Sequence, residues 1–269
     1  MRPSIKRANY ITFVEVTLTA AVLAILAAII IPFVNRANQK GKMAQWKSLR
    51  NELLLDQAIV AYFDFADGKG DVLSNSVTPS NQGPQDPFDF EARIMPGVDW
   101  VKDRWGMKWG LDFTGESSYV FSKFSLPDHS NTVILWFRTE EQDAALFSAT
   151  KTRDLSSKTF RSIILSKGNV VSITGNGSVK SSKNCSDNNW HMVAVTMGAK
   201  YNKHILYLDG EKVGDFDDFT LGYEEQENVF LGYSNNSPYF KGIMDEFMIF
   251  KRELSSEEIK KIYSTSAPQ

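Results

Sequence analysis

The feature that most constrains this chain is an apolar run that begins at Val16 and ends at Val34. At 1.5 Å per residue, a helix of this length measures about 29 Å, close to the hydrocarbon thickness of a bilayer. Lys6 and Arg7 precede the run, and basic residues there place the N-terminus in the cytoplasm. A cleaved signal peptide is the alternative, but its cleavage site needs small residues, whereas this run ends in bulky ones. The sequence therefore predicts a transmembrane helix over residues 11–34.

One carboxylate, that of Glu15, lies at the start of the apolar run. An unpaired charge is costly in hydrocarbon, so an ionisable residue there is by default a functional hypothesis. The basic leader, the segment Ile11-Thr12-Phe13-Val14-Glu15 and the in-register Pro32 together resemble the N-terminus of type IV pilins and pseudopilins. That resemblance implies cleavage by a prepilin peptidase between Tyr10 and Ile11, methylation of the new N-terminus, and a bend of the helix at Pro32. It also implies that Glu15 neutralises the N-terminal amine of the adjacent subunit during assembly.

Tyr10 departs from the family pattern, which places Gly or Ala immediately before the cut. A bulky aromatic side chain at this position hinders the peptidase. An uncleaved anchor therefore stays open as the alternative.

The segment 35–57 continues the helical pattern as a stem. Met43, Trp46, Leu49 and Leu53 recur at spacings of three and four residues, with polar residues between them. Two partners for this apolar stripe stay open, namely the domain that follows it and the stems of neighbouring subunits.

The pattern of residues 58–269 predicts a β domain. Alternating or apolar segments with turn residues between them are typical of an antiparallel sandwich. They predict strands at 59–65, 132–139, 161–165, 170–174, 190–197, 205–208, 228–233 and 242–250. Asp209-Gly210 predicts a tight hairpin, and Gly168-Asn169 a second turn. Ser255 and Glu258 predict a capping box that opens a short final helix, and residues 74–98 are expected to form a long surface loop.

The order of several segments resembles the laminin-G-like, concanavalin A-like jelly roll. The segments are 60–65, Gly110-Leu111-Asp112-Phe113-Thr114-Gly115, the strand after Asn189-Trp190-His191, Leu206-Tyr207-Leu208-Asp209-Gly210 and 240–247. The resemblance implies a mainly β fold, an antiparallel β-sandwich jelly roll that follows the long N-terminal helix. Members of this family bind sugars, bind proteins or serve as spacers, so the fold alone does not give the function.

The same resemblance implies a structural calcium ion held by Asp245 with Asp67 or Asp64 as its partner. Calcium prefers six to eight oxygen ligands, which carboxylates and backbone carbonyls supply. The alternative is that Asp245 caps a turn or accepts hydrogen bonds from backbone amides.

Aromatic side chains suggest a second kind of site. Trp100, Trp105 and Trp109, together with Tyr119, are candidates for a platform that binds sugar rings. The competing interpretation places Trp105 and Trp109 in the core. Trp136 and Trp190 lie in apolar strands and are expected to be core residues.

The composition excludes several functions. A net charge of −2 gives no electrostatic case for nucleic acid, and a single Cys185 excludes an intrachain disulfide. A glycosidase needs two facing carboxylates, whereas Asp215, Asp217 and Asp218 fall in a hairpin. The resemblance to the jelly-roll family implies that His191 makes a structural hydrogen bond. We therefore expect a protein that is not an enzyme.

The sequence thus predicts a leader (residues 1–10), a transmembrane helix (11–34), a stem (35–57) and a jelly-roll domain (58–269). We interpret the chain as a pilin-like or pseudopilin-like subunit of a type IV pilus or type II secretion system. It would span the bacterial inner membrane once, with its domain periplasmic or on the cell surface for adhesion, cargo contact or recognition of a glycan or protein. The alternative is an uncleaved, membrane-tethered carbohydrate-binding protein that does not polymerise.

Overall fold

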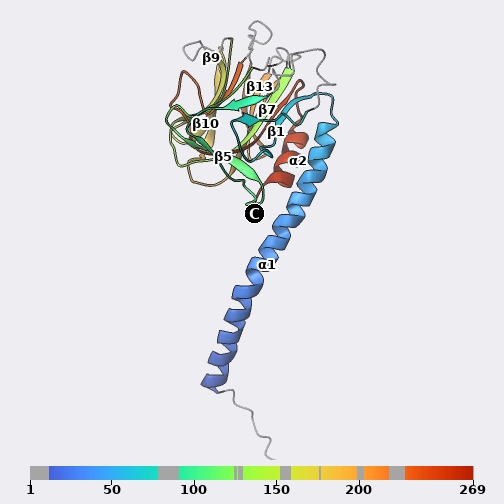
Figure 1. Cartoon of the computed structure of the whole chain (residues 1–269), viewed down its shortest axis with the longest axis vertical. Helices are drawn as coiled ribbons and strands as arrows, with labels where there is room; N and C mark the ends of the chain where they lie inside the picture. Colours follow the sequence, from blue (N-terminus) through green and yellow to red (C-terminus); the bar gives the residue numbers. More distant parts are fainter. Residues whose placement is uncertain are drawn as a thin grey trace, which may run out of the picture. The chain divides into compact units, whose positions relative to one another are not determined.

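A computed structural model describes residues 12–77, 91–123, 126, 130–151, 159–175, 177–198, 203–217 and 228–268. The chain divides into two compact units, residues 1–44 and residues 45–269, and we call the second unit the head. Helix α1 (Phe13–Leu54) runs from the first unit into the head, so residues 45–54 belong to the head (Figure 1). The predicted membrane helix and stem are therefore one continuous helix. Tyr10 and Ile11, the expected cleavage point, lie outside the described residues.

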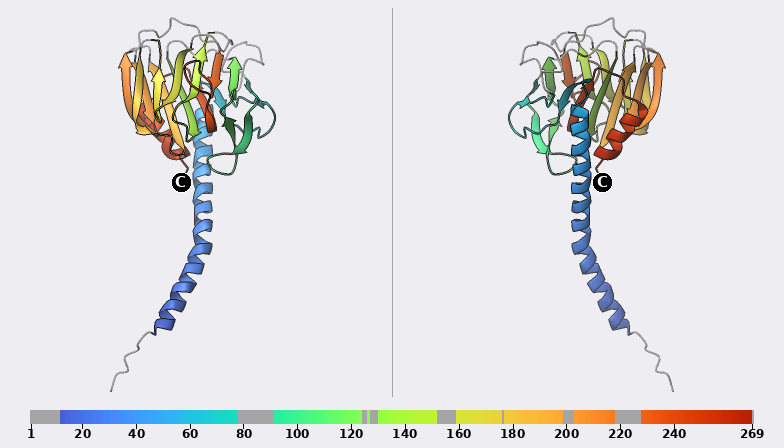
Figure 2. Two further views of the ribbon diagram at one scale, coloured as in Figure 1. Left: turned by 90° about the vertical axis from the view of Figure 1, so that its left-hand side faces the viewer. Right: turned by 90° about the vertical axis from the view of Figure 1, so that its right-hand side faces the viewer.

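The head contains two antiparallel sheets, which Figure 2 shows as a layered sandwich. In the first sheet the strand order is β14 (Glu211–Asp217), β13 (Lys203–Leu208), β12 (His191–Gly198), β7 (Ser130–Arg138), β16 (Lys241–Phe250), β5 (Trp109–Thr114) and β4 (Val98–Lys102). Strand β1 (Ile59–Phe63) also pairs with β16. The order in the second sheet is β11 (Ser178–Asn184), β10 (Asn169–Ile173), β9 (Thr159–Ser166), β8 (Ala144–Thr150), β15 (Asn228–Leu231), β6 (Val120–Lys123), β3 (Ala92–Ile94) and β2 (Val72–Leu73). The predicted mainly β sandwich behind a long N-terminal helix is confirmed.

Strand β7 shows why the first sheet is buried on both sides. Its alternate residues Val133 and Leu135 face the core between the two sheets. Ile134 and Trp136 face outward into a second core, which helix α2 (Ser256–Ser266) and residues 45–54 complete. Because both faces are covered, the strand is apolar almost throughout instead of alternating with polar residues.

The local turn chemistry follows the sequence at most points. Asp209 and Gly210 adopt φ angles of 51° and 79° between β13 and β14, as the hairpin prediction requires. The capping box at Ser255 and Glu258 is present and opens α2. The turn between β9 and β10 lies at Lys167 and Gly168, one residue before the expected pair, because these two residues have the positive φ angles.

The prediction of a surface loop over residues 74–98 was wrong in part. Strand β3 lies inside this range and pairs with both β2 and β6. Ala92 and Ile94 are buried, with the exposed Arg93 between them, so the segment has strand periodicity over only three residues. Such a short strand is easily missed beside a long Pro- and Gln-rich stretch.

Candidate functional site

Two regions of the chain carry functional candidates, and the first is the N-terminal half of α1. Among the described residues, α1 alone is long and apolar enough to cross a membrane, with a mean hydropathy of 2.6 over its apolar window and none of that window buried. By length and composition such a helix could be a membrane anchor or a signal sequence. Pro32 lies inside the helix.

Glu15 has a specific local role at the start of α1. Its carboxylate accepts hydrogen bonds from the Thr12 backbone N–H at 2.7 Å and the Thr12 hydroxyl at 2.9 Å. The Glu15 backbone N–H donates in turn to the Thr12 hydroxyl at 3.2 Å. This reciprocal arrangement is a capping box, which satisfies backbone donors that a helix start leaves free. The resemblance to pilins implies an assembly role for Glu15, and the cap is a second, local role that this resemblance does not include.

A cluster of buried charges lies on the outer face of the first sheet. Glu246 has a φ angle of 45° at a bulge between Asp245 and Phe247 in β16. Neighbouring residues of a regular strand point to opposite faces, and a bulge can place two in succession on one face. Both Asp245 and Glu246 consequently contact Arg104.

Arg104 is the centre of this cluster. Its side chain is fully buried, forms an ion pair with Asp245 and donates to Glu246 at 2.6 Å. Its guanidinium also lies over the rings of Trp136 and Trp46, at 4.9 and 5.8 Å from their centroids. Burial raises the pKa of Asp245 above its ordinary value, although Arg104 opposes this.

Residues 45–54 of α1 join the head through the same cluster. The Trp46 indole N–H donates to Glu246 at 2.8 Å, and the Tyr62 hydroxyl donates to the same oxygen at 2.9 Å. Trp46 is fully buried and Leu49 is 5% exposed. The sequence left two partners open for the apolar stripe of the stem. Trp46 and Leu49 pack on the domain that follows them in the same chain.

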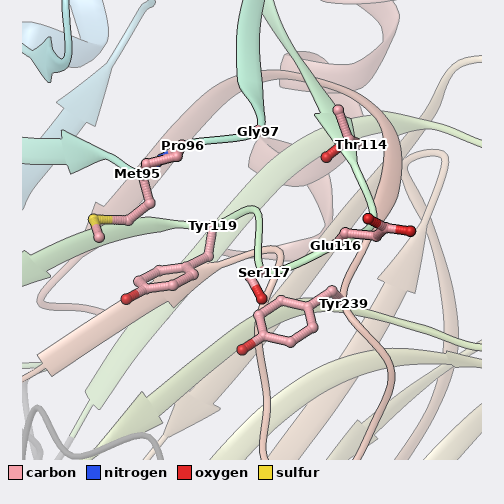
Figure 3. A pocket seen from close by; sticks show the side chains of 8 residues that line it. All are labelled: Met95, Pro96, Gly97, Thr114, Glu116, Ser117, Tyr119 and Tyr239. Atoms are coloured by element: carbon pink, nitrogen blue, oxygen red, sulfur yellow. The ribbon is translucent and has the colours of Figure 1, made fainter.

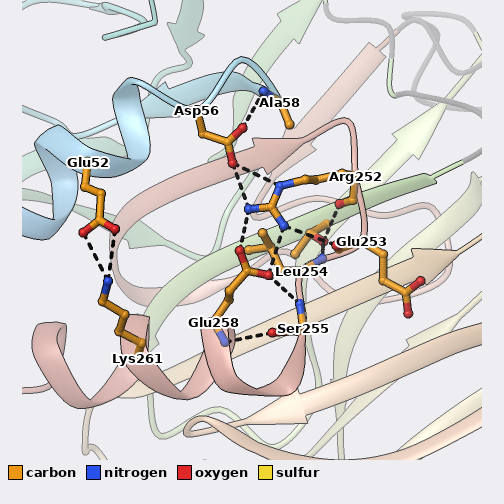
Figure 4. Close-up of polar contacts among 10 residues, drawn as sticks. Glu52, Asp56, Ala58, Arg252, Glu253, Leu254, Ser255, Glu258 and Lys261 are labelled. Atoms are coloured by element: carbon orange, nitrogen blue, oxygen red, sulfur yellow. Dashed lines mark hydrogen bonds and ion pairs between the residues drawn. The ribbon is translucent and has the colours of Figure 1, made fainter.

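A second junction lies where α1 ends and α2 begins (Figure 4). Arg252 donates to Asp56 at 2.8 and 3.0 Å and to Glu258 at 2.5 and 3.0 Å. Glu258 is also the capping-box residue of α2, accepting from the Ser255 backbone N–H at 2.8 Å. Hydrogen bonds to Glu258 raise the pKa of Arg252 above its ordinary value. This network ties the end of α1, the end of β16 and the start of α2 together.

The three aspartates expected to hold calcium have protein partners instead. Asp245 is paired with Arg104, and Asp64 with Arg50 at 2.5 Å. Asp67 accepts from the backbone N–H and the hydroxyl of Ser74. The described residues include no cluster of three or more His, Cys, Asp or Glu side chains that could hold a metal ion. The residues present do not fit the expected calcium site, because arginines neutralise two of the three carboxylates.

The three tryptophans do not form a common platform. Trp105 is 3% exposed in the core beneath α2, so its assignment to a ligand platform is corrected. Trp100 is partly buried and donates to the Gly70 carbonyl at 2.8 Å. Trp109 is half-buried, and the Lys102 amine lies 4.1 Å from its ring centroid.

An aromatic site does occur, on the outer face of the second sheet. Phe121, Phe230 and Tyr233 are buried there, and the partly exposed Tyr119 and Tyr239 pack against them. The centroids of the Tyr119 and Tyr239 rings are 6.4 Å apart, with 30° between their planes. The sequence groups Tyr119 with the tryptophans, but in the structure its ring packs against Tyr233 and Tyr239. These tyrosines lie more than 100 residues away, so spacing in the sequence does not indicate the contact.

Tyr119 and Tyr239 line an open cavity of about 550 Å³, which we call the tyrosine hollow (Figure 3). Three connections meet there, those between β3 and β4, β5 and β6, and β15 and β16. The lining residues are Met95, Pro96, Gly97, Thr114, Glu116, Ser117, Tyr119 and Tyr239.

Backbone hydrogen bonds hold these connections in place. The Met95 N–H donates to the Tyr119 carbonyl at 3.0 Å, and the Thr114 N–H donates to the Gly97 carbonyl at 3.0 Å. Gly97 has a φ angle of 86°, and a Cβ atom there would lie 2.8 Å from the Thr114 hydroxyl. Only glycine therefore permits this close approach of the two loops. Ser117 also has a positive φ angle, 55°, a conformation that is costly without glycine and often occurs at functional sites.

The loop that carries Tyr239 is fastened to the second sheet. The Ser148 hydroxyl donates to the Tyr233 carbonyl at 2.6 Å, and the Ala145 N–H donates to the Pro238 carbonyl at 2.8 Å. Both donors belong to β8. These hydrogen bonds hold the loop that lines one side of the tyrosine hollow.

His191 has the structural role that the sequence predicted. Its ring nitrogens lie 2.9 Å from the Asp209 carboxylate and 3.1 Å from the Asp187 carboxylate. Burial lowers the pKa of His191, but these carboxylates more than compensate and raise it above the ordinary value of 6.5.

Residues 113–260, more than half of the chain, match the laminin G-like family model described as the concanavalin A-like lectin/glucanases superfamily. The chain belongs to this superfamily. No curated protein matches it in sequence.

Several solved structures have a similar fold. The botulinum neurotoxin serotype D binding domain matches with a TM-score of 0.57 and 15% identity, over 78% of this chain and 52% of that one. The binding domain of botulinum neurotoxin DC matches in complex with SialylT (TM-score 0.57) and with rat synaptotagmin II (TM-score 0.56), each at 13% identity over 77% of this chain and 51% of that one. This chain spans about half the length of those proteins, and at such identity the likeness concerns the fold alone.

Proposed function

We propose that this chain is a pilin-like or pseudopilin-like subunit that displays its lectin-like head outside the bacterial inner membrane. The observation that carries the proposal is the apolar surface of the first part of α1. Large side chains are exposed all round it, among them Phe13 (82%), Leu23 (60%), Ile31 (56%) and Phe33 (71%). A helix that is hydrophobic on every side requires lipid or other helices around it. In the membrane the N-terminus would be cytoplasmic, and after assembly neighbouring α1 helices would replace the lipid.

Glu15 supports the assembly role by its position. It is the one acidic residue in the apolar part of α1, and in a low dielectric a carboxylate needs a partner. In a single subunit the Thr12 donors supply hydrogen bonds but no opposite charge. The N-terminal amine of an adjacent subunit, freed by a prepilin peptidase at Ile11, would supply that charge.

Two features support display of a binding domain. The head belongs to a superfamily named for lectins as well as glucanases, and the botulinum neurotoxin structures of similar fold are binding domains. We propose binding without turnover, since Asp215 and Asp217, two of the acidic candidates, each form an ion pair with Lys203.

Assembly is tested with Glu15→Gln in the full chain. We expect normal membrane insertion and loss of incorporation into filaments, because the amide has the same shape but cannot neutralise an amine. Glu52→Gln changes a glutamate of the same helix outside the apolar part and should assemble normally. Thr12→Ala separates the two roles of Glu15, because it weakens the cap and keeps the charge. An assembly defect in Thr12→Ala equal to that of Glu15→Gln would show that only the cap matters.

The N-terminal sequence of the protein from its native membrane tests processing. A chain that begins at Ile11 supports the pilin-like proposal. A chain that retains Lys6 and Arg7 would instead support the alternative, an uncleaved anchor whose head is a tethered binding domain.

A further inference from the structure

The tyrosine hollow places polar groups beside two aromatic rings. Among the described residues, no protein group hydrogen-bonds to the hydroxyls of Tyr119, Tyr239, Thr114 or Ser117, or to the Glu116 carboxylate. Figure 3 shows the Ser117 hydroxyl near the two phenol rings, with Glu116 and Thr114 beyond it. Four hydroxyls and one carboxylate therefore border the same 550 Å³ cavity as the two partly exposed rings.

We propose that the tyrosine hollow is a saccharide-binding site that selects neutral sugars over acidic ones. A pyranose ring has an apolar C–H face and a rim of hydroxyl groups. The tyrosine rings match the face, and the hydroxyls and the carboxylate match the rim. The volume lies within the range of about 300 to 1,000 Å³ that is usual for small-ligand sites.

The selectivity follows from charge. Glu116 is exposed and is the only charged residue among the eight that line the cavity. A carboxylate accepts hydrogen bonds from sugar hydroxyls, and charged acceptors make the stronger hydrogen bonds. The same carboxylate repels the acid group of sialic or uronic acids, since like charges at a binding site disfavour the wrong partner.

The arrangement favours a small polar ligand over a protein surface. Phe121 is 7% exposed, Phe230 1% and Tyr233 7%, so the broad aromatic cluster is already covered within the head. What stays accessible is the two partly exposed rings with their surrounding hydroxyls. Protein interfaces of ordinary size bury far more area than two partly exposed tyrosine rings provide.

The experiment measures binding by the full chain in detergent to immobilised neutral oligosaccharides and to their sialylated counterparts. We expect at least one neutral oligosaccharide to bind, with at least tenfold weaker binding of its sialylated form. Tyr119→Ala and Tyr239→Ala should each weaken the neutral interaction tenfold or more. Glu116→Gln keeps the shape of the side chain and should reduce the difference in affinity between the neutral and the sialylated oligosaccharide.

Controls separate binding from folding and from anchoring. Tyr119→Phe and Tyr239→Phe keep the rings, so they should bind more weakly than the parent but better than the alanine variants. Trp190→Ala removes an aromatic side chain outside the hollow and should bind like the parent. Melting temperatures confirm that each variant is folded.

Three results would overturn the inference: no neutral oligosaccharide binds, the tyrosine variants bind as the parent does, or the sialylated sugars bind as well as the neutral ones. Loss in Trp100→Ala without loss in the tyrosine variants would place the site on the tryptophans instead. The inference rests on the proposed role of the head as a binding domain. Incorporation of Tyr119→Ala into filaments is measured in the same cells. Normal incorporation with lost sugar binding would show that the two proposals stand or fail separately.

Discussion

The two outer faces of the sandwich are covered in different ways. On the first sheet, α2 and residues 45–54 bury the face completely around Trp136, with Arg104 and its two carboxylates inside. On the second sheet, aromatic residues cover the face themselves, and Tyr119 and Tyr239 stay partly exposed at a cavity. One face is therefore packed against α2 and residues 45–54, whereas the other keeps two tyrosine side chains partly exposed at a cavity.

The largest expected effect concerns the boundary of the head. A chain that begins at residue 45 should unfold cooperatively, whereas one that begins at residue 58 should not fold. The shorter chain lacks Trp46 and Leu49, and loss of a buried Trp or Leu costs about 2 to 5 kcal/mol each. Together these losses approach the whole stability of a typical domain. Urea unfolding followed by circular dichroism checks this, and equal midpoints for the two chains would contradict it.

The next effect concerns the buried charges of the first sheet. Arg104→Met should lower the free energy of unfolding by about 3 to 5 kcal/mol, because it leaves buried carboxylates without their cation. The loss should be smaller at acidic pH, where Asp245 takes up a proton and becomes neutral, as its raised pKa favours. Urea unfolding at two pH values measures both effects.

Lys260→Met provides the control for Arg104→Met. It removes a cation from an ion pair with Glu211 in which both side chains are exposed. Exposed pairs of this kind contribute little, so no measurable change is expected. A similar loss in both variants would mean that burial does not decide the cost of removing the charge.

How much of this comparison the sequence could predict depends on the range of each interaction. The strands, the Asp209-Gly210 hairpin and the Ser255 capping box follow from patterns within ten residues or fewer. The sandwich follows from their order. The Arg104 cluster joins residues more than 140 positions apart, and the bulge that turns Glu246 outward leaves no pattern in an apolar strand. Tyr119 and Tyr239 are also far apart in the sequence, so their contact could not be predicted from it. Each lies beside turn-forming residues near the end of a strand.

A smaller effect is expected on the second sheet. Tyr119→Ala and Tyr239→Ala should each lower the free energy of unfolding by only about 1 to 2 kcal/mol, because both rings are partly exposed and mainly lose aromatic contacts. Phe230→Ala beneath them should cost about 3 to 5 kcal/mol, since Phe230 is 1% exposed. Thermal and urea unfolding test this ranking. If the tyrosines cost as much as Phe230, they belong to the core and the second face is not available to a ligand.

The smallest expected effect is the pH dependence at His191, the first residue of β12 in the first sheet. Its pKa is higher in the folded chain than the ordinary 6.5, owing mainly to Asp209 and Asp187 against the opposing effects of burial and of Lys183. Its stabilising contribution is therefore complete below about pH 6.5 and declines as the pH rises through the higher folded value. Between about pH 6 and pH 9 the parent should lose more stability than His191→Gln, which cannot titrate.

The Asp209 carboxylate beside His191 sets the lower pH limit of this stabilisation. The pKa of Asp209 is lowered in the folded chain, because hydrogen bonds from His191 and Lys183 outweigh the effect of burial. Its contribution is thus present above the ordinary value of 3.8 and is lost as the pH falls through the lower folded value. The His191 cluster should accordingly stabilise the head most between these two limits. Urea midpoints at pH 5, 7 and 9 for the parent and His191→Gln decide the matter, because parallel curves would mean that His191 binds no extra proton on folding and acts only through its neutral hydrogen bonds.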